Sequence, residues 1–180
     1  KSNFLIKSII FFTIYSSSFI ACSEEIISVR ESKKNSILAG ISLTKDTTNS
    51  SSVDLPLLRL EYNHNFNKNY SLGLNAGTLI VYNQIDLFGR YYLDFISTKN
   101  AAFYFQGNLG YSEYSLQINQ DVPRYINLIP ELGYEFREDN GFTFNASLIP
   151  IGIGFSVPQN KISNFILYGL TAEIKLGYSF

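Results

Sequence analysis

Few residues in this chain could carry out catalysis. It has one histidine, His64, and one cysteine, Cys22, among 180 residues. Acyl-transfer chemistry needs a histidine base beside a nucleophilic serine, with an acid that orients the ring. No serine stands near His64 in the sequence, so such a site would have to take its serine from a neighbouring strand. We therefore predict no enzyme and no cofactor, and one cysteine with one histidine excludes a zinc site.

Ten charged residues recur at alternate positions of otherwise apolar segments. They are Arg59, Glu61, Asp86, Arg90, Asp94, Glu131, Glu135, Arg137, Glu173 and Lys175. Charges removed from bulk water must be paired and hydrogen-bonded, or each of them costs several kcal/mol. If the fold encloses these residues, they predict an ion-pair network that fills the enclosed space. The alternative is a narrow path for ions or small solutes, and the acidic excess would then favour cations.

The composition narrows the class of protein. Hydrophobic residues make up 46% of the chain and charged residues 16%, whereas a soluble domain usually carries about 25% charged residues. The length allows a single domain. The net charge of −1 provides no basic surface, which excludes nucleic acid as a partner.

From residue 36 onward the sequence alternates with a period of two, as strands do. In the last segment, for example, Ile174 and Leu176 alternate with Glu173 and Lys175. The pattern covers 36–44, 54–66, 70–82, 85–96, 101–114, 124–137, 142–156 and 166–180. Strands of these lengths can cross a bilayer at a tilt. We predict an all-β fold, namely a single antiparallel, up-and-down transmembrane β-barrel of about eight strands.

Glycines and aromatic residues indicate which face meets lipid. Each strand has one set of alternate positions that is mostly apolar and one that is mostly polar, here called the apolar and the polar parity. Most strand glycines belong to the polar parity, where a narrow barrel interior needs small residues, whereas Gly89 and Gly107 belong to the apolar parity. Aromatic rings on the apolar parity flank three short turns and close the last strand, as in a membrane-barrel girdle. The predicted periplasmic girdle is Phe66, Tyr70, Phe95, Phe103, Phe136, Phe142, Tyr178 and Phe180. We interpret His64, which lies near the same end, as an interfacial residue of this girdle.

Two prolines fall inside predicted strands, where proline removes a ladder hydrogen bond. A hairpin centred near Asn140 would bring Pro130 and Pro150 roughly opposite each other. Beyond Pro150 the apolar parity switches, from Leu148 to Ile151. We predict a β-bulge at this point, and a lateral gap for lipid is the alternative.

The first 23 residues have the layout of a secretory signal peptide. Two lysines and an apolar run at 9–15 precede small residues at 16–23. Cleavage before Glu24 would follow the small residues Ala21 and Ser23; in the alternative, 19–22 is a lipobox and Cys22 is lipidated. Residues 24–35 are then a periplasmic lead-in, and residues 36–180 form the barrel.

The last strand resembles the assembly signal of outer-membrane proteins, with Ile174, Leu176, Tyr178 and Phe180 on one face. Together with the signal peptide and the strand pattern over 36–180, this makes the chain resemble the small OmpA-like, porin-family barrels of eight strands. The resemblance implies a place in the bacterial outer membrane and insertion by the outer-membrane assembly machinery through this strand. It also implies contact with outer-membrane lipids and lipopolysaccharide, and we expect a monomer.

The function that we expect is structural or surface-interacting, with a filled polar lumen and exposed loops at 44–53, 116–124 and 157–163. These loops carry Ser, Thr, Asn and Asp but no aromatic cluster typical of a binding hot spot, so they do not identify the extracellular ligand. Two alternatives are a narrow ion or small-solute channel through the lumen and an enzyme that modifies lipid A or another envelope lipid through His64.

Overall fold

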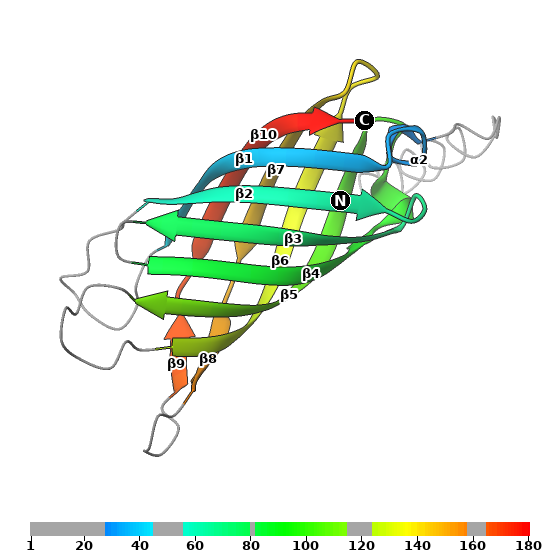
Figure 1. The fold of residues 1–180 in the computed structure, drawn as a ribbon. Coiled ribbons are helices and arrows are strands. Elements are labelled where there is room, and N and C mark those ends of the chain that lie inside the picture. The colour runs from blue at the N-terminus through cyan, green and yellow to red at the C-terminus, as the bar shows by residue number, and fades with distance from the viewer. Residues whose placement is uncertain (1–27, 45–55, 80–81, 115–123, 158–164) are drawn as a thin grey trace, which may run out of the picture.

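The computed structural model describes residues 28–44, 56–79, 82–114, 124–157 and 165–180, which form a tilted sheet that closes on itself (Figure 1). One helical turn, α2 (Val29–Ser32), precedes the strands, and a 3₁₀ turn, η1 (Asp94–Ile96), lies between β4 and β5. The strands are β1 (Asn35–Thr44), β2 (Pro56–Asn65), β3 (Tyr70–Leu79), β4 (Tyr82–Tyr92), β5 (Ala101–Tyr114), β6 (Arg124–Arg137), β7 (Phe142–Ile149), β8 (Gly152–Ser156), β9 (Phe165–Tyr168) and β10 (Thr171–Ser179). No helix within these ranges is long and apolar enough to cross a membrane.

Each strand pairs antiparallel with its neighbours, and the pairing of β5 with β6 closes the sheet. Both β7 and β8 pair with β6, while β10 pairs with β7 and β9 with β8. The successive segments β7 and β8 therefore act as one long, interrupted strand, and so do β9 and β10. The ten segments make an eight-stranded up-and-down barrel, which confirms the predicted fold class.

The interruption between β7 and β8 is a β-bulge. Leu132 of β6 pairs with Leu148, whereas Leu128 pairs with Ile153. Three residues of β6 (129–131) thus face four residues of the partner (149–152), so the partner contains one extra residue. This residue shifts the register by one position and switches the outward-facing parity, which confirms the bulge predicted from the prolines.

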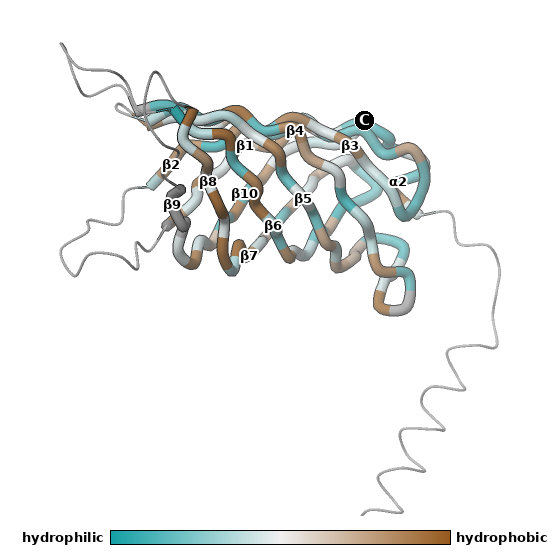
Figure 2. The backbone as a smooth tube through the Cα atoms, turned by 90° about the horizontal axis from the view of Figure 1, so that it is seen from below, coloured by the Kyte–Doolittle hydropathy of each residue, from teal (hydrophilic) through white to brown (hydrophobic). Residues whose placement is uncertain are grey.

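Burial alternates along each strand in the sense opposite to that of a soluble protein. In β2, Arg59 and Glu61 are buried, whereas Leu58, Leu60 and Tyr62 are 60%, 55% and 43% exposed. Figure 2 shows the same alternation of hydrophilic and hydrophobic residues along the barrel wall. Apolar side chains cover the outside and polar side chains fill the lumen, as in barrels that stand in lipid.

The short turns gather at the end of the barrel that also holds α2 and the end of β10 (Figure 1). In the turn after β2, the Asn67 side-chain oxygen accepts hydrogen bonds from the backbone N–H groups of Asn69 and Tyr70, each at 2.9 Å. In the turn after β6, Gly141 has a φ of 104° and its N–H donates to the Glu138 carbonyl. Glycine adopts this left-handed conformation without steric cost.

The structure corrects two predicted strand boundaries. Residues 83 and 84, which fall between the predicted strands 70–82 and 85–96, belong to β4, and Asn83 pairs with Thr78 of β3. At its other end β4 stops at Tyr92 and does not extend to residue 96. The chain turns there because the Ser97 hydroxyl donates to the Leu93 carbonyl at 2.5 Å and the Ser97 N–H donates to the Asp94 carbonyl.

Candidate functional site

The lumen of the barrel holds a dense group of buried charges. Each strand charge buried in the described part of the chain comes from β2, β4, β6 or β10: Arg59, Glu61, Asp86, Arg90, Glu131, Glu135, Arg137, Glu173 and Lys175. The strands between them, β1, β3, β5 and β7, contribute uncharged side chains to the buried set. Long side chains therefore reach into the lumen over strands that carry small or neutral residues.

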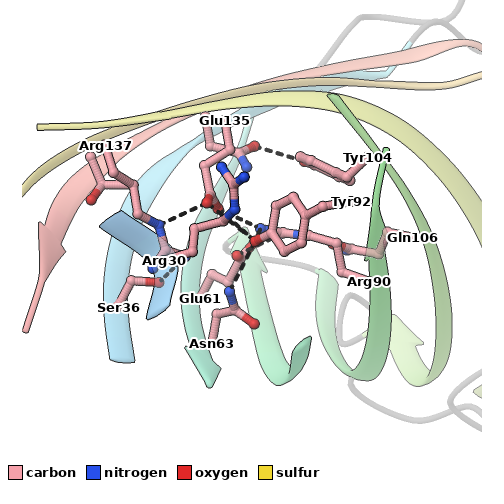
Figure 3. A network of polar contacts seen from close by, with 12 residues as sticks. Arg30, Ser36, Glu61, Asn63, Arg90, Tyr92, Tyr104, Gln106, Glu135 and Arg137 are labelled. Atoms are coloured by element: carbon pink, nitrogen blue, oxygen red, sulfur yellow. Dashed lines mark hydrogen bonds and ion pairs between the residues drawn. The ribbon is translucent and has the colours of Figure 1, made fainter. Parts of the chain in front are cut away.

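The half of the group nearer the short turns, here called the inner half, is tightly hydrogen-bonded. Arg137 Nε donates to Glu135 Oε1 at 2.7 Å, and Arg90 Nη1 donates to Glu135 Oε2 at 2.9 Å. Arg90 Nη2 then donates to Glu61 Oε1 at 2.8 Å. All four side chains are fully buried, so each charge depends on its partner for solvation. Figure 3 shows this cluster together with the residues around it.

The half of the group farther from the short turns, here called the outer half, also lies in the lumen and continues the alternation of positive and negative charge. Lys175 Nζ lies 2.8 Å from Glu61 and 2.7 Å from Glu173. Arg59 Nε lies 3.1 Å from Glu173, and Arg59 Nη1 lies 3.5 Å from Asp86. Among the described residues, these Arg59 nitrogens have no partner in hydrogen-bond geometry, so this end is held less tightly than the inner half. The two halves form one chain, in order Arg137, Glu135, Arg90, Glu61, Lys175, Glu173, Arg59 and Asp86, here called the lumen ion-pair chain.

Arg90 is the most fully coordinated member of the lumen ion-pair chain. Besides its two carboxylate partners, its Nε donates to Gln106 at 2.7 Å. Its guanidinium lies 4.1 Å from the Tyr104 ring centroid and 5.1 Å from that of Phe88. Aromatic faces attract a desolvated guanidinium, so these rings both hold Arg90 and fill the lumen around it.

Glu131 lies in the lumen, as predicted, but outside the lumen ion-pair chain. Its carboxylate accepts hydrogen bonds from the Tyr104 hydroxyl at 3.0 Å and from Gln106 Nε2 at 2.8 Å. These donors and a third, Asn108 Nδ2 at 3.4 Å, are neutral, so Glu131 is hydrogen-bonded without a cation in contact among the described residues. Asp94 is not in the lumen: it begins η1, its side chain is 54% exposed, and it lies 3.7 Å from Lys68. The prediction for Asp94 is wrong because β4 ends before it.

The segment before β1 closes the turn-side end of the lumen, which sequence reasoning missed. Ser28 and Glu31 form a capping box that starts α2, and both Val29 and Arg30 are 2% exposed. The Arg30 guanidinium lies 4.7 Å from the Tyr92 ring centroid, and burial lowers its pKa. The spacing Ser28-x-x-Glu31 is a signal for a helix start that could have been found. The expected lead-in therefore includes a plug at residues 28–34.

Arg30 changes the charge balance of the enclosed space. Five buried cations, namely Arg30, Arg59, Arg90, Arg137 and Lys175, stand against five buried carboxylates, namely Glu61, Asp86, Glu131, Glu135 and Glu173. The expected acidic excess, which would have favoured cations, is therefore wrong for the residues that the structure describes. It depended on including Asp94 and on leaving out Arg30.

The aromatic residues predicted for the girdle mostly lie outward near the turns. Phe66, Tyr70, Phe103, Phe142, Tyr178 and Phe180 are exposed, and Phe136 is half-buried. Phe95 belongs to η1, and its side chain lies outside the described part. In β10, Ile174 and Leu176 share the outer face with Tyr178.

His64 lies near the turn-side end of β2, between Asn35 and Phe66. Its Nδ1 lies 2.8 Å from the Asn35 side-chain oxygen, and its ring meets Phe66 edge-on at 5.2 Å between centroids. In the described ranges, no three side chains of the metal-binding types His, Cys, Asp and Glu are grouped to hold a metal ion. Cys22, the signal segment 1–23 and most of the loops at 44–53, 116–124 and 157–163 lie outside the described residues.

Comparisons with known proteins agree with this architecture. No protein-family model and no curated protein matches the chain. Among solved structures, the N-terminal β-barrel domain of Pseudomonas aeruginosa OprF matches with a TM-score of 0.56 and 14% identity, covering 82% of this chain and 98% of that one. The outer membrane protein OprG from the same organism matches with a TM-score of 0.52 and 14% identity, covering 82% and 96%. At these identities the likeness shows the fold alone: this chain shares the eight-stranded barrel of those proteins.

Proposed function

We propose that this chain is an integral protein of a bacterial outer membrane whose closed barrel anchors surface loops. The observation that carries the proposal is the reversed burial: apolar side chains outside and a lumen ion-pair chain inside. A soluble barrel would bury its leucines and expose its charges. Lipid is the solvent in which this arrangement is stable, because exposed apolar residues cost nothing there while the charges are paired internally.

The filled lumen supports an anchoring role over a channel. Arg90, Tyr92 and Tyr104 occupy the centre of the inner half, and Arg30 covers its turn-side end. An eight-stranded barrel is just wide enough to be filled by side chains. Ion flow would require several buried pairs to separate at once, which is costly when each charge depends on its partner.

The strand ends that flank residues 45–55, 115–123 and 158–164 lie at the end of the barrel opposite the short turns. If the short turns face the periplasm, these polar segments face the outside, where they would meet lipopolysaccharide or an extracellular ligand. Assembly through β10, cleavage of the signal peptide and a monomeric state remain predictions of the same proposal, with lipidation of Cys22 as the alternative to ordinary cleavage.

Fractionation and conductance together test the proposal. The full chain is expressed in a Gram-negative host, and we expect it in the outer-membrane fraction with heat-modifiable mobility in unboiled gels. In planar bilayers the purified protein should show no sustained conductance steps. Recovery from the soluble periplasm would contradict the membrane placement, whereas regular conductance steps would replace the anchoring role with the channel alternative.

A further inference from the structure

Two glycines on the outer face of the barrel have no steric reason to be glycine. At Gly73 and Gly133, facing the lumen, an added Cβ would overlap the side chains of Phe88 and Tyr104. At Gly89 and Gly107 an added Cβ would meet nothing within 4 Å, and both residues are exposed. Glycine weakens a strand, so its presence where a side chain would fit calls for another explanation. Because they have no side chains, both residues leave a depression in the outer surface.

The strand register aligns these glycines with both unusual prolines. Gly89 of β4 pairs with Gly107 of β5, and Gly107 pairs with Pro130 of β6. Pro150 stands at the bulge between β7 and β8. Together with these three residues it lines a surface cavity of about 600 Å³. This row of small and compact residues crosses four strands, which is about 14 Å at the usual strand spacing of about 4.8 Å.

Two ridges of large side chains border the row. On the turn side, Tyr91, Phe105 and Leu132 are aligned by the register. On the other side stands a parallel row, Leu87, Leu109 and Leu128. All six side chains are exposed. The outer face therefore carries an elongated apolar groove between two ridges, here called the glycine–proline groove.

Over β4, β5 and β6 the glycine–proline groove is a hollow in a wall whose backbone pairing is unbroken. The pairing of β5 with β6 continues without interruption from Ala101–Phe136 to Glu113–Arg124, beneath and beyond the groove. On the lumen side, Arg90, Gln106 and Glu131 are joined by hydrogen bonds of 2.7 and 2.8 Å. At Pro130 and Pro150 themselves, pairing of β6 with β7 stops at Leu132–Leu148 and pairing with β8 resumes at Leu128–Ile153, so lumen side chains rather than backbone pairing line the groove there.

We propose that the glycine–proline groove binds one acyl chain of a membrane phospholipid, an inference that rests on the membrane placement proposed above. The groove is continuous with the apolar belt that faces lipid, and its shape is long, narrow and apolar. At its turn side, Tyr70 and Tyr91 pack with their ring centroids 5.1 Å apart. Tyrosines of this kind stand at membrane interfaces, so this ridge places the groove just inside the interface of the turn-side leaflet, where the headgroup would lie.

A second copy of the chain fits the groove less well. A two-fold dimer centred on the groove would place the same surface on both partners, so one hollow would face another. The contact would then leave an unfilled space between the two barrels. A flexible acyl chain has no such restriction, because it enters the groove lengthwise.

The experiment uses the full chain in vesicles that contain a phospholipid with a photoreactive diazirine in its acyl chain. After irradiation, the cross-linked peptides are identified by mass spectrometry. We expect cross-links concentrated on β4, β5 and β6 around Gly89, Gly107 and Pro130. Cross-links spread evenly over all outward-facing strands would overturn the proposal without requiring any variant.

Substitutions then fill the groove. Gly107→Leu, alone and together with Gly89→Leu, places side chains in open space, so the barrel should still fold. Ala39→Leu, at an exposed position on β1, is the matched control. We expect the two groove variants to lose the concentrated cross-links and the control to keep them. Unchanged cross-linking in both groove variants, or a dimer that the substitutions dissolve, would contradict an acyl-chain site.

Membrane fractionation of the same preparations separates the two proposals. If the unaltered chain does not enter the membrane, the proposed function fails and the groove proposal fails with it. If the chain inserts with heat-modifiable mobility but cross-links uniformly, the groove proposal alone is wrong.

Discussion

Arg90 of β4 and Glu61 of β2 meet over the strand that separates them, with Nη2 of Arg90 2.8 Å from Oε1 of Glu61. The strand between them, β3, places Ser71, Gly73, Asn75 and Gly77 on the inner face. These side chains are short, so the two long ones can extend over them. The arrangement explains why the buried charges of the barrel come from alternate strands: neighbouring strands that both carried long charged side chains would overfill the lumen.

Removing Glu61 should be among the most damaging single changes in the lumen. Glu61 accepts from both Arg90 and Lys175, at 2.8 Å in each case. Glu61→Ala leaves two buried cations short of a partner, which should lower the free energy of unfolding by about 3–5 kcal/mol. Urea unfolding in detergent, followed by the mobility shift in unboiled gels, measures the loss. Asp86→Asn is the control, since losing the 3.5 Å contact of Asp86 with Arg59 should destabilise the barrel less. Equal losses would contradict the difference in tightness between the two halves of the lumen ion-pair chain.

A charge on the outer face should be costly if that face meets lipid. Leu60 lies midway along β2 and is 55% exposed. Leu60→Arg should lower the free energy of unfolding in phospholipid vesicles by about 2–4 kcal/mol, because arginine is then held in hydrocarbon. Lys68→Arg, at an exposed position in the turn after β2, should change it little. If Leu60→Arg were also neutral, the outer face would be solvated by water.

Glycines inside and outside the barrel should respond in opposite ways. Gly133→Ala pushes a methyl group into the Tyr104 ring, so we expect a smaller folded fraction on refolding into detergent. Gly107→Ala adds the same group in open space and should leave the folded fraction unchanged or raised, because alanine weakens a strand less than glycine. Band intensities in unboiled gels provide both values, and equal effects would show that the lumen is not tightly packed at Tyr104.

The plug at residues 28–34 should depend on its capping box. Ser28→Ala removes the acceptor for the Arg30 N–H and should destabilise α2 by about 1 kcal/mol. We expect faster proteolysis of this segment in the otherwise intact barrel, measured by the time course of cleavage. Ser32→Ala leaves the capping box in place and serves for comparison. The same rate in the Ser28 variant as in the native chain would mean that the buried Arg30 and Val29 hold the plug without the cap.

His64 should be dispensable for lipid chemistry. It lies at the turn-side end of β2, at the opposite end of the strand from the outer leaflet that the proposed orientation gives to lipid A. Lipid A from cells that express the native chain and from cells that express His64→Ala should have identical mass spectra. A modification that appears with the native chain and disappears with the variant would revive the enzyme alternative.

Much of the fold follows from local patterns. The period of two places Leu60 and Glu61 on opposite faces of a strand whatever the strand's partners are. The parity change at Pro150 shows an extra residue before any pairing is known. The two errors in the site have local causes as well. Asp94 keeps the alternation of β4 although the chain has already turned into η1, and the short segment holding Arg30 carried a capping signal that was not used.

The alternation of residues is enough to establish which side chains share a face, and therefore that charges and leucines lie on opposite sides of one sheet. Three features follow from the fold: which carboxylate meets which cation, the place of Arg30 at the turn-side end, and the alignment of Gly89, Gly107 and Pro130 across three strands. The reason is the range of the forces involved. Side-chain alternation is a property of each strand's own backbone, whereas these neighbours arise from strand register and from the pairing of β1 with β10, which joins residues far apart in the chain.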